Sequence, residues 1–359
     1  GAVYTDTELS RPLIGIANSY TNLFPGHTTQ NSIAQAVAAG IYMAGGTPME
    51  FNTIAVCDGV AMGHEGMRYS LPSREIIADS IEIMVQAHCL DAIVLIASCD
   101  KIVPGALKAA ARLNIPAILI GAGPMLPGRH KGRCISGVDM EEYTASMFRG
   151  DVTEADVLEM ENNSQPTCGS CAGLFTANSM GCLAEALGLA LPGNGTIPAV
   201  YAARTRLAKQ TGMRIVSMLE EGLTPDKILT ETAFINALKV SMMMGSSTNI
   251  ALHLPAIAKE MGVPLSLSTI DSLSKDTPTI CALSPAGRHF IVDLDEAGGI
   301  SAIMRQGIDA GMLDGSAITV TGQTQDENTK NSCIENTEVI RPFTNPYYPE
   351  GGLTVLWGN

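Results

Sequence analysis

The sequence has few aromatic residues and few charged residues, and its charges are mostly of one sign. Aromatic residues make up 4% and charged residues 16% of the 359 positions, and 22 Lys plus Arg face 36 Asp plus Glu. The resulting net charge of −14 leaves no basic stripe that could bind nucleic acid or an anionic membrane surface. A hydrophobic fraction of 46% is typical of a compact enzyme core rather than of a disordered chain.

Long apolar runs and targeting signals are also lacking. No uninterrupted apolar run approaches the roughly 18 residues of a transmembrane helix, and residues 1–5 lack the regions of a signal peptide. The nine cysteines are an odd number in a long chain, which argues against a secreted disulfide framework and favours reduced thiols, some of them metal ligands. We therefore expect a cytoplasmic protein. The chain contains no P-loop, dinucleotide fingerprint, HExxH or GxSxG motif.

Strand and helix patterns alternate in the first third of the chain. Apolar segments predict buried strands at 12–17, 49–56, 91–97 and 117–120. Helical spacing predicts helices at 32–43, at 74–88 with Ser73 as the cap, and at 104–113. This order predicts a mainly parallel sheet with helices on both faces. The expected fold class is therefore α/β, as a three-layer α/β/α domain with a large helical portion.

The rest of the chain is predicted to be mainly helical. The expected helices are 140–149, 152–160, 174–187, 198–220, 230–244 and 250–261, and two late strands are expected at 290–294 and 318–320. Residues 331–359 are rich in Asn, Pro, Gly and Tyr and have no helical period, which is typical of a connecting arm.

Reactive side chains concentrate in three short loops. Cys57 and Asp58 follow the second predicted strand, Cys99, Asp100 and Lys101 follow the third, and the last loop is Cys168-Gly169-Ser170-Cys171. Because ligands bind at the carboxyl ends of parallel strands, the first two loops should converge on one crevice. Thiolates suit iron and carboxylates suit Mg²⁺, so the pattern favours a site with two kinds of metal.

A lysine beside such a site needs an explanation, because its positive charge would repel metal ions. Reaction of neutral Lys101 with CO₂ would convert it to a carbamate, an anionic oxygen ligand. Taken singly, each motif has a more ordinary interpretation. A Cys-x-x-Cys pair can also be a zinc clip or a redox pair. The remaining cysteines are expected to be small buried apolar residues: Cys89, Cys134, Cys182, Cys281 and Cys333.

Two glycine-rich loops are weaker candidates. Residues 121–124 and 192–196 could hold a phosphate or carboxylate through backbone N–H groups, although turns are the more common explanation.

The ordered series of motifs resembles the dihydroxy-acid dehydratase and 6-phosphogluconate dehydratase family, and within it dihydroxy-acid dehydratases most. Besides the three loops, the matching stretches are Gly15-Ile16-Ala17-Asn18-Ser19, Glu50-Phe51-Asn52-Thr53-Ile54, Tyr69-Ser70-Leu71-Pro72-Ser73-Arg74-Glu75, Phe175-Thr176-Ala177-Asn178-Ser179-Met180, Pro192-Gly193-Asn194-Gly195, Gly245-Ser246-Ser247-Thr248-Asn249 and Glu338-Val339-Ile340-Arg341-Pro342. Residues 133–164 match the family poorly.

The resemblance implies a hydro-lyase that converts a 2,3-dihydroxy carboxylic acid to a 2-keto acid in branched-chain amino-acid biosynthesis. It implies that Cys99 and Cys171 bind an iron–sulfur cluster, and that Asp58, Asp100 and carbamylated Lys101 bind Mg²⁺. A homodimer acting on a small hydroxy acid is expected, without nucleic-acid or membrane partners. Sugar acids such as gluconate, arabinonate or xylonate remain alternative substrates. A zinc-clipped binding domain or a thiol oxidoreductase at Cys168 and Cys171 are the alternatives of another class.

The sequence departs from the family pattern at two places. Gly26 stands where members with a [2Fe-2S] cluster carry a further cysteine, so a [4Fe-4S] cluster is expected. Cys57 is the favoured third ligand, with Cys168 as the alternative. The chain also stops before the family's C-terminal β-barrel domain, which carries the catalytic base and another acidic Mg²⁺ ligand. We expect 1–330 to be the cluster- and Mg²⁺-binding domain, 331–359 an arm toward that absent domain, and the isolated chain to be inactive.

Overall fold

Buried apolar segments form the central sheet, as their lack of alternation predicts. All five residues of β3 are buried, which requires cover on both faces of the strand. The structure is a computed structural model that describes residues 3–358, and its four parallel strands lie in the order β2-β1-β3-β4. Their bounds are β1 Leu13–Asn18, β2 Thr47–Asn52, β3 Ala92–Ile96 and β4 Ala117–Ile120.

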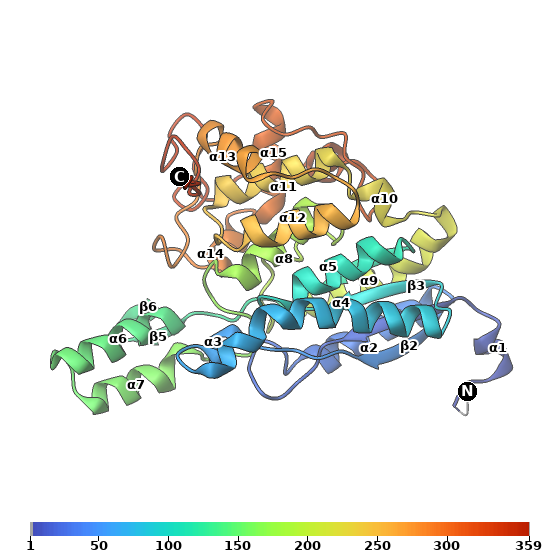
Figure 1. Ribbon diagram of the computed structural model, residues 1–359, viewed down its shortest axis with the longest axis horizontal. Coiled ribbons are helices and arrows are strands. Elements are labelled where there is room, and N and C mark those ends of the chain that lie inside the picture. The colour runs from blue at the N-terminus through green and yellow to red at the C-terminus, as the bar shows by residue number, and fades with distance from the viewer. Residues whose placement is uncertain (1–2, 359) are drawn as a thin grey trace.

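Two pairs of long helices cover this sheet. Helices α2 (Gln30–Met43) and α9 (Ala202–Glu221) pack together on one face, and α4 (Ser70–Ala87) and α5 (Ile102–Leu113) pack together on the other (Figure 1). The predicted three-layer α/β/α architecture is therefore confirmed.

A group of helices packs beyond α5, through contacts of α5 with α8 and α12 (Figure 1). Local signals fix these helices well: the Thr230 hydroxyl accepts a hydrogen bond from the Ala233 N–H where α11 begins, and α11 ends at Gly245 with φ +71°. The bounds are α8 Thr176–Ala186, α11 Glu231–Met244, α12 Ile250–Glu260, α13 Leu267–Asp276, α14 Ile291–Glu296, α15 Gly299–Asp309 and α16 Gln325–Thr329.

An arm made of a hairpin and two helices projects away from the sheet (Figure 1). It consists of β5 Gly128–His130, β6 Arg133–Ile135, α6 Gly137–Arg149 and α7 Glu154–Ser164. The hairpin was not predicted from the sequence. The remaining short elements are α1 Asp6–Leu9, α3 Asp58–Ala61, the 3₁₀ helix η1 Glu65–Tyr69 and α10 Pro225–Ile228.

Several sequence predictions were wrong in detail. The strand predicted at 290–294 is helix α14, and 318–320 forms only one isolated bridge, between Ile318 and Thr324. β2 spans Thr47–Asn52, so it begins two residues earlier and ends four residues earlier than the strand predicted at 49–56. Ser73 does not cap α4 but lies inside it, where its hydroxyl donates to the Ser70 carbonyl at 2.6 Å. Residues 331–358 contain no helix or strand, as expected, and bridges such as Thr279–Tyr348 hold part of this segment against the body.

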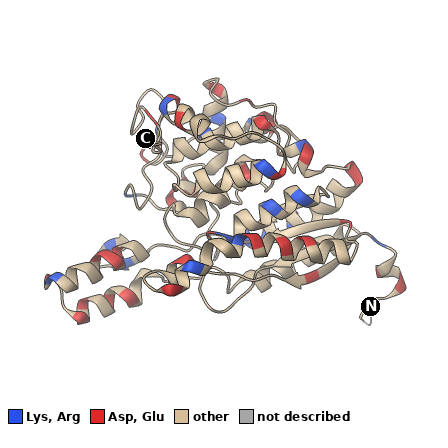
Figure 2. Ribbon diagram, viewed as in Figure 1, with Lys and Arg blue, Asp and Glu red and all other residues tan. Residues whose placement is uncertain are grey.

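Acidic and basic residues both occur along the outer helices (Figure 2). None of the helices that the structure describes is long and apolar enough to span a membrane.

The crossing of α2 and α9 depends on two glycines. A Cβ atom on Gly40 would overlap the carbonyl oxygen of Lys209, and one on Gly212 would overlap that of Val37. We expect Gly40→Ala to lower the free energy of unfolding by about 1–3 kcal/mol, because overpacking exceeds the helix-propensity gain of alanine. Gly181→Ala in α8 is the matched control, since a Cβ there meets nothing within 4 Å. It should leave stability unchanged or raise it, and urea denaturation that ranks the two variants oppositely would contradict this packing.

Candidate functional site

The two predicted strand-end loops meet at the carboxyl edge of the sheet. After β2 the chain reaches Cys57, which precedes the short helix α3, and Asp58 begins that helix. After β3 the chain passes Cys99 and Asp100 to Lys101, which caps α5. Because both strands run in the same direction, their loops lie at one edge. The two loops meet at this edge, where Lys101 contacts Asp58.

Cys99 is held in an unusual backbone conformation. It is buried, and its φ of +67° lies in the left-handed region that non-glycine residues rarely adopt. The neighbouring Ser98 hydroxyl accepts a hydrogen bond from the Ala122 N–H at 2.9 Å. The Ser98 carbonyl contacts the fully buried ring of His27 at 2.9 Å. The loops after β1, β3 and β4 therefore fix the direction of the Cys99 side chain.

The Cys168–Cys171 loop is bonded to the strand-end loops although it comes much later in the chain. The Gly169 N–H donates to the Pro25 carbonyl at 3.0 Å, and the Ser170 N–H donates to the Gly123 carbonyl at 2.9 Å. Gly169 has a φ of +123°, and a Cβ there would lie 2.5 Å from the Met125 nitrogen, so only glycine fits this position. These contacts bring the loop to the carboxyl edge of the sheet.

Three of the predicted thiols interact with one another. A hydrogen bond from the Cys99 thiol lowers the pKa of Cys57 to about 7. The same hydrogen bond, and then burial, raises the pKa of Cys99. Burial and the nearby charge of Cys57 raise the pKa of Cys171 to about 12. Cys171 nevertheless keeps an exposed surface; we interpret it as a thiol crowded by protein on several sides and open on one.

The position of Gly26 bears on the same group. A Cβ atom on Gly26 would lie 2.8 Å from the Cys99 sulfur, so position 26 lies directly against this thiol and a side chain there would require the Cys99 side chain to shift. Cys168 is half-buried. Of the cysteines predicted to be small buried residues, Cys182 and Cys281 are buried, whereas the prediction was wrong for three that are exposed: Cys89, Cys134 and Cys333.

The two predicted acids share the lysine between them. Lys101 Nζ lies 2.7 Å from Asp58 Oδ2 and 3.2 Å from Asp100 Oδ2, and all three side chains are largely buried. Burial raises the pKa of Asp100 to about 6, with a further contribution from Asp58 and against the opposing effect of Lys101. The Ser70 hydroxyl donates to Asp58 Oδ1 at 2.5 Å. Within residues 3–358, no three His, Cys, Asp or Glu side chains form a ready-made metal-binding group.

The glycine-rich loops use their polar groups within the protein. The Gly121 N–H donates to Asn194 Oδ1 at 2.8 Å, and the fully buried Arg204 guanidinium donates to the Gly121 and Asn194 carbonyls. The two loops therefore bind each other, which favours the structural interpretation over a phosphate site.

Sequence reasoning missed two polar residues near the acids. Ser70 lies in the 69–75 motif, which served only as evidence of family resemblance, and the sequence pattern assigned no role to His253. His253 follows the Gly245–Asn249 motif and lies in the first turn of α12, fully buried. A histidine one turn after a polar loop at a helix start was the available signal.

Fold and site together define an α/β protein whose thiols and carboxylates converge at the carboxyl edge of a parallel sheet. The chain belongs to the family described as "Dihydroxy-acid/6-phosphogluconate dehydratase N-terminal", which matches residues 11–328. The family resemblance drawn from the motifs is therefore confirmed.

Curated relatives support the same assignment. The chain is 55% identical over 355 residues to a protein of Moorella thermoacetica named dihydroxy-acid dehydratase, covering 99% of this chain and 64% of the relative. Proteins of the same name from Ignicoccus hospitalis and Pyrococcus abyssi are 56% and 54% identical, over 354 and 355 residues. In both cases the match again covers 99% of this chain and 64% of the relative. The chain thus spans slightly less than two thirds of these relatives.

Proposed function

We propose that this chain supplies the metal-binding half of a hydro-lyase that converts a branched 2,3-dihydroxy carboxylic acid to a 2-keto acid. The observation that carries the proposal is the convergence of three thiols, two carboxylates and a lysine at one edge of the sheet. The names of the relatives support the same reaction. In it, C2 loses a proton, C3 loses hydroxide, and the resulting enol gains a proton at C3 to become the 2-keto acid.

Cys57, Cys99 and Cys171 are the proposed ligands of an iron–sulfur cluster. The lowering of the pKa of Cys57 by Cys99, with both residues in loops at the ends of parallel strands, supports Cys57 over Cys168 as the third ligand. Three thiols with glycine at position 26 fit a [4Fe-4S] cluster, in which three protein ligands leave one iron open. The Asn178 side-chain amide donates to the Cys171 and Gly173 carbonyls, the latter at 2.7 Å, and so holds the Cys171 loop in position.

Asp58, Asp100 and Lys101 are the proposed ligands of Mg²⁺. The Lys101 ammonium already lies where two carboxylates bind a cation. We propose that the deprotonated Lys101 amine attacks the carbon of CO₂, that one C=O electron pair moves to oxygen, and that nitrogen releases a proton to water. The product is a carbamate anion, whose hard oxygens fit Mg²⁺ as the carboxylates do.

In this proposal, residues of this chain bind and orient the substrate next to the side chains that bind the metals. When bound, the open iron position and Mg²⁺ supply Lewis acids that help the C3 hydroxyl leave and stabilise the enolate. Ser70 fixes the rotamer of Asp58 through its hydrogen bond. The proposal assigns no general base among residues 3–358.

The competing interpretations receive less support. A redox-active Cys-x-x-Cys pair requires an accessible thiolate of lowered pKa, whereas burial raises the pKa of Cys171. The thiol of lowered pKa is Cys57, which lies outside that motif. A zinc clip at Cys168 and Cys171 leaves the cluster of Asp58, Asp100 and Lys101 unexplained.

Metal analysis and product formation test the proposal together. After anaerobic purification we expect iron and acid-labile sulfide in comparable amounts, and 2-keto acid formation from a branched 2,3-dihydroxy acid when the complete protein is supplied with Mg²⁺. Gluconate, arabinonate and xylonate form the comparison panel. Zinc without sulfide would refute the cluster, and faster turnover of a sugar acid would move the protein to the sugar-acid branch.

A further inference from the structure

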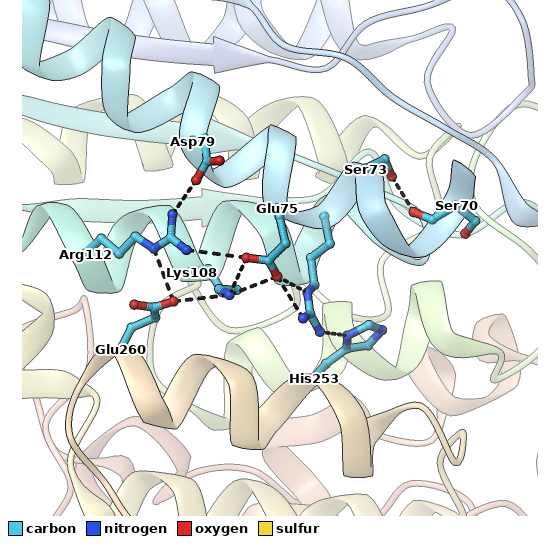
Figure 3. Close-up of polar contacts among 9 residues, drawn as sticks. Ser70, Ser73, Glu75, Asp79, Lys108, Arg112, His253 and Glu260 are labelled. Atoms are coloured by element: carbon cyan, nitrogen blue, oxygen red, sulfur yellow. Dashed lines mark hydrogen bonds and ion pairs between the residues drawn. The ribbon is translucent and has the colours of Figure 1, made fainter. Parts of the chain in front are cut away.

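His253 on α12 carries a buried hydrogen-bond donor for which no described residue is the acceptor. Its side chain is fully buried, and Arg74 Nη1 donates to its Nδ1 at 3.1 Å (Figure 3). Because a guanidinium can only donate, Nδ1 must be the acceptor and the ring proton of neutral His253 lies on Nε2. That Nε2 has no hydrogen-bond partner among residues 3–358. A buried donor of this kind is costly unless an acceptor is supplied.

Contacts along α4 place this donor beside Asp58. Ser70 donates to Asp58, and Arg74, one helical turn further along α4, donates to His253. Side chains four residues apart on a helix are neighbours on one face. The residues held by Ser70 and Arg74 therefore lie on the same side of α4, and Asp58 is close enough for its charge to affect the pKa of His253.

The register of α5 and α12 agrees with this placement. Lys108 and Arg112 of α5 both bind Glu260 of α12, at 3.1 Å and 3.2 Å (Figure 3). Arg112 also binds Asp79 of α4. Asp79 lies further along α4 than Arg74, which binds His253 of α12. Helices α4 and α12 therefore run in the same direction. Lys101 precedes Lys108 by seven residues, or about two helical turns, and His253 precedes Glu260 by the same number. Lys101 and His253 thus occupy matching positions at the start of their helices.

The surroundings keep the ring neutral. Burial, and then the positive charges of Lys101 and Arg74, lower the pKa of His253 to about 3, against a smaller opposing effect of Asp58. Nε2 therefore remains a donor at neutral pH. The nearby Lys101, whose charge contributes to the lowered pKa of His253, is in its unmodified form also only a donor.

We propose that the Nε2–H group of His253 donates a hydrogen bond to a carbamate oxygen of Lys101, and so makes His253 a positioning residue for that modification. This inference rests on the carbamate of the proposed function. Carbamylation removes two of the three N–H donors of the lysine ammonium and adds two acceptor oxygens that share one negative charge. It would supply an acceptor for the buried donor of His253 without moving α12.

The test measures the carbamate itself rather than activity. The purified protein is titrated with ¹³C-bicarbonate in the presence of Mg²⁺, and the carbamate signal is identified as the ¹³C resonance that Lys101→Arg lacks. We expect His253→Leu to need about tenfold more bicarbonate for half-occupancy, since a hydrogen bond to a charged group has about this effect. His253→Gln, whose amide can accept from Arg74 and donate to the carbamate, should stay within about twofold of wild type.

A matched control and a second readout keep the result interpretable. His130→Leu replaces another buried histidine, in the β5 hairpin, whose ring nitrogens also lack hydrogen-bond partners among residues 3–358 and whose Nδ1 lies 3.7 Å from Glu159 Oε1; it should titrate as wild type. Should His253→Leu fail to fold, ¹⁵N-histidine spectra of the wild type decide: the Nε2–H signal of His253 should shift with bicarbonate, and not in Lys101→Arg. Unchanged occupancy in folded His253→Leu, or an unshifted signal, overturns the inference. Absence of any wild-type carbamate overturns the proposed Lys101 chemistry instead.

Discussion

Replacing Cys99 with serine is expected to abolish binding of the iron–sulfur cluster, with iron, acid-labile sulfide and visible absorption all falling at least about tenfold after anaerobic purification. Cys99 is the most buried of the three cysteines, and it lowers the pKa of Cys57. Serine keeps the size and the left-handed backbone but replaces a soft sulfur donor with a weakly binding hydroxyl. The loss therefore reports ligation rather than misfolding.

Three further substitutions sharpen this result. Cys333→Ser changes an exposed cysteine in the segment after α16 and should leave the iron content unchanged. Cys57→Ser should deplete iron as strongly as Cys99→Ser, whereas Cys168→Ser should deplete it far less. Full iron and sulfide in Cys99→Ser would refute the ligand set, and depletion by Cys168→Ser alone would exchange the third ligand.

The parts of the site that could be predicted are those that sheet topology determines. Cys57, Asp58, Cys99, Asp100 and Lys101 directly follow apolar segments, and a parallel sheet must bring such residues to one edge. The Cys168–Cys171 loop could be added only through the family resemblance. Its contacts with the loops at Pro25 and Gly123 join segments that no local pattern connects.

The residues that were missed come from helix packing rather than from strand ends. His253 meets Arg74 across 179 positions of sequence, and that contact depends on the relative register of α4 and α12. Hydrophobic periodicity reveals which face of a helix is buried, but it does not reveal which residue of another helix lies opposite.

The errors in the fold have a similar cause. The apolar run at 290–294 is as compatible with a strand as with a helix by pattern alone. It forms α14 because Asp293 accepts a hydrogen bond from the Phe290 N–H at 2.7 Å, and because Ile291 and Leu294 both face the core. Ser73 was mistaken for a cap because η1 leads directly into α4, so that the cap position is Tyr69, whose side chain makes no cap hydrogen bond, and the helix already begins at Ser70.

Replacing Lys101 with methionine is expected to destabilise the metal-free protein by about 3–5 kcal/mol, the usual effect of removing one partner from a buried ion pair. Lys101 is the cation that Asp58 and Asp100 share, and its side chain is only 6% exposed. Methionine fills a similar volume without charge, so the loss is mainly electrostatic. Urea denaturation in the presence of a chelator measures it.

A second substitution shows whether charge is the cause. Asp58→Asn removes one of the two acids, so in the Lys101→Met background it should recover part of the lost stability, whereas alone it should destabilise. Mg²⁺ should also stabilise Lys101→Met, because a divalent cation can replace the ammonium between the carboxylates. If Lys101→Met unfolds like the wild type, or if Asp58→Asn has the same effect in both backgrounds, the three side chains do not act as one buried group. The proposed Mg²⁺ site would then lose its physical basis.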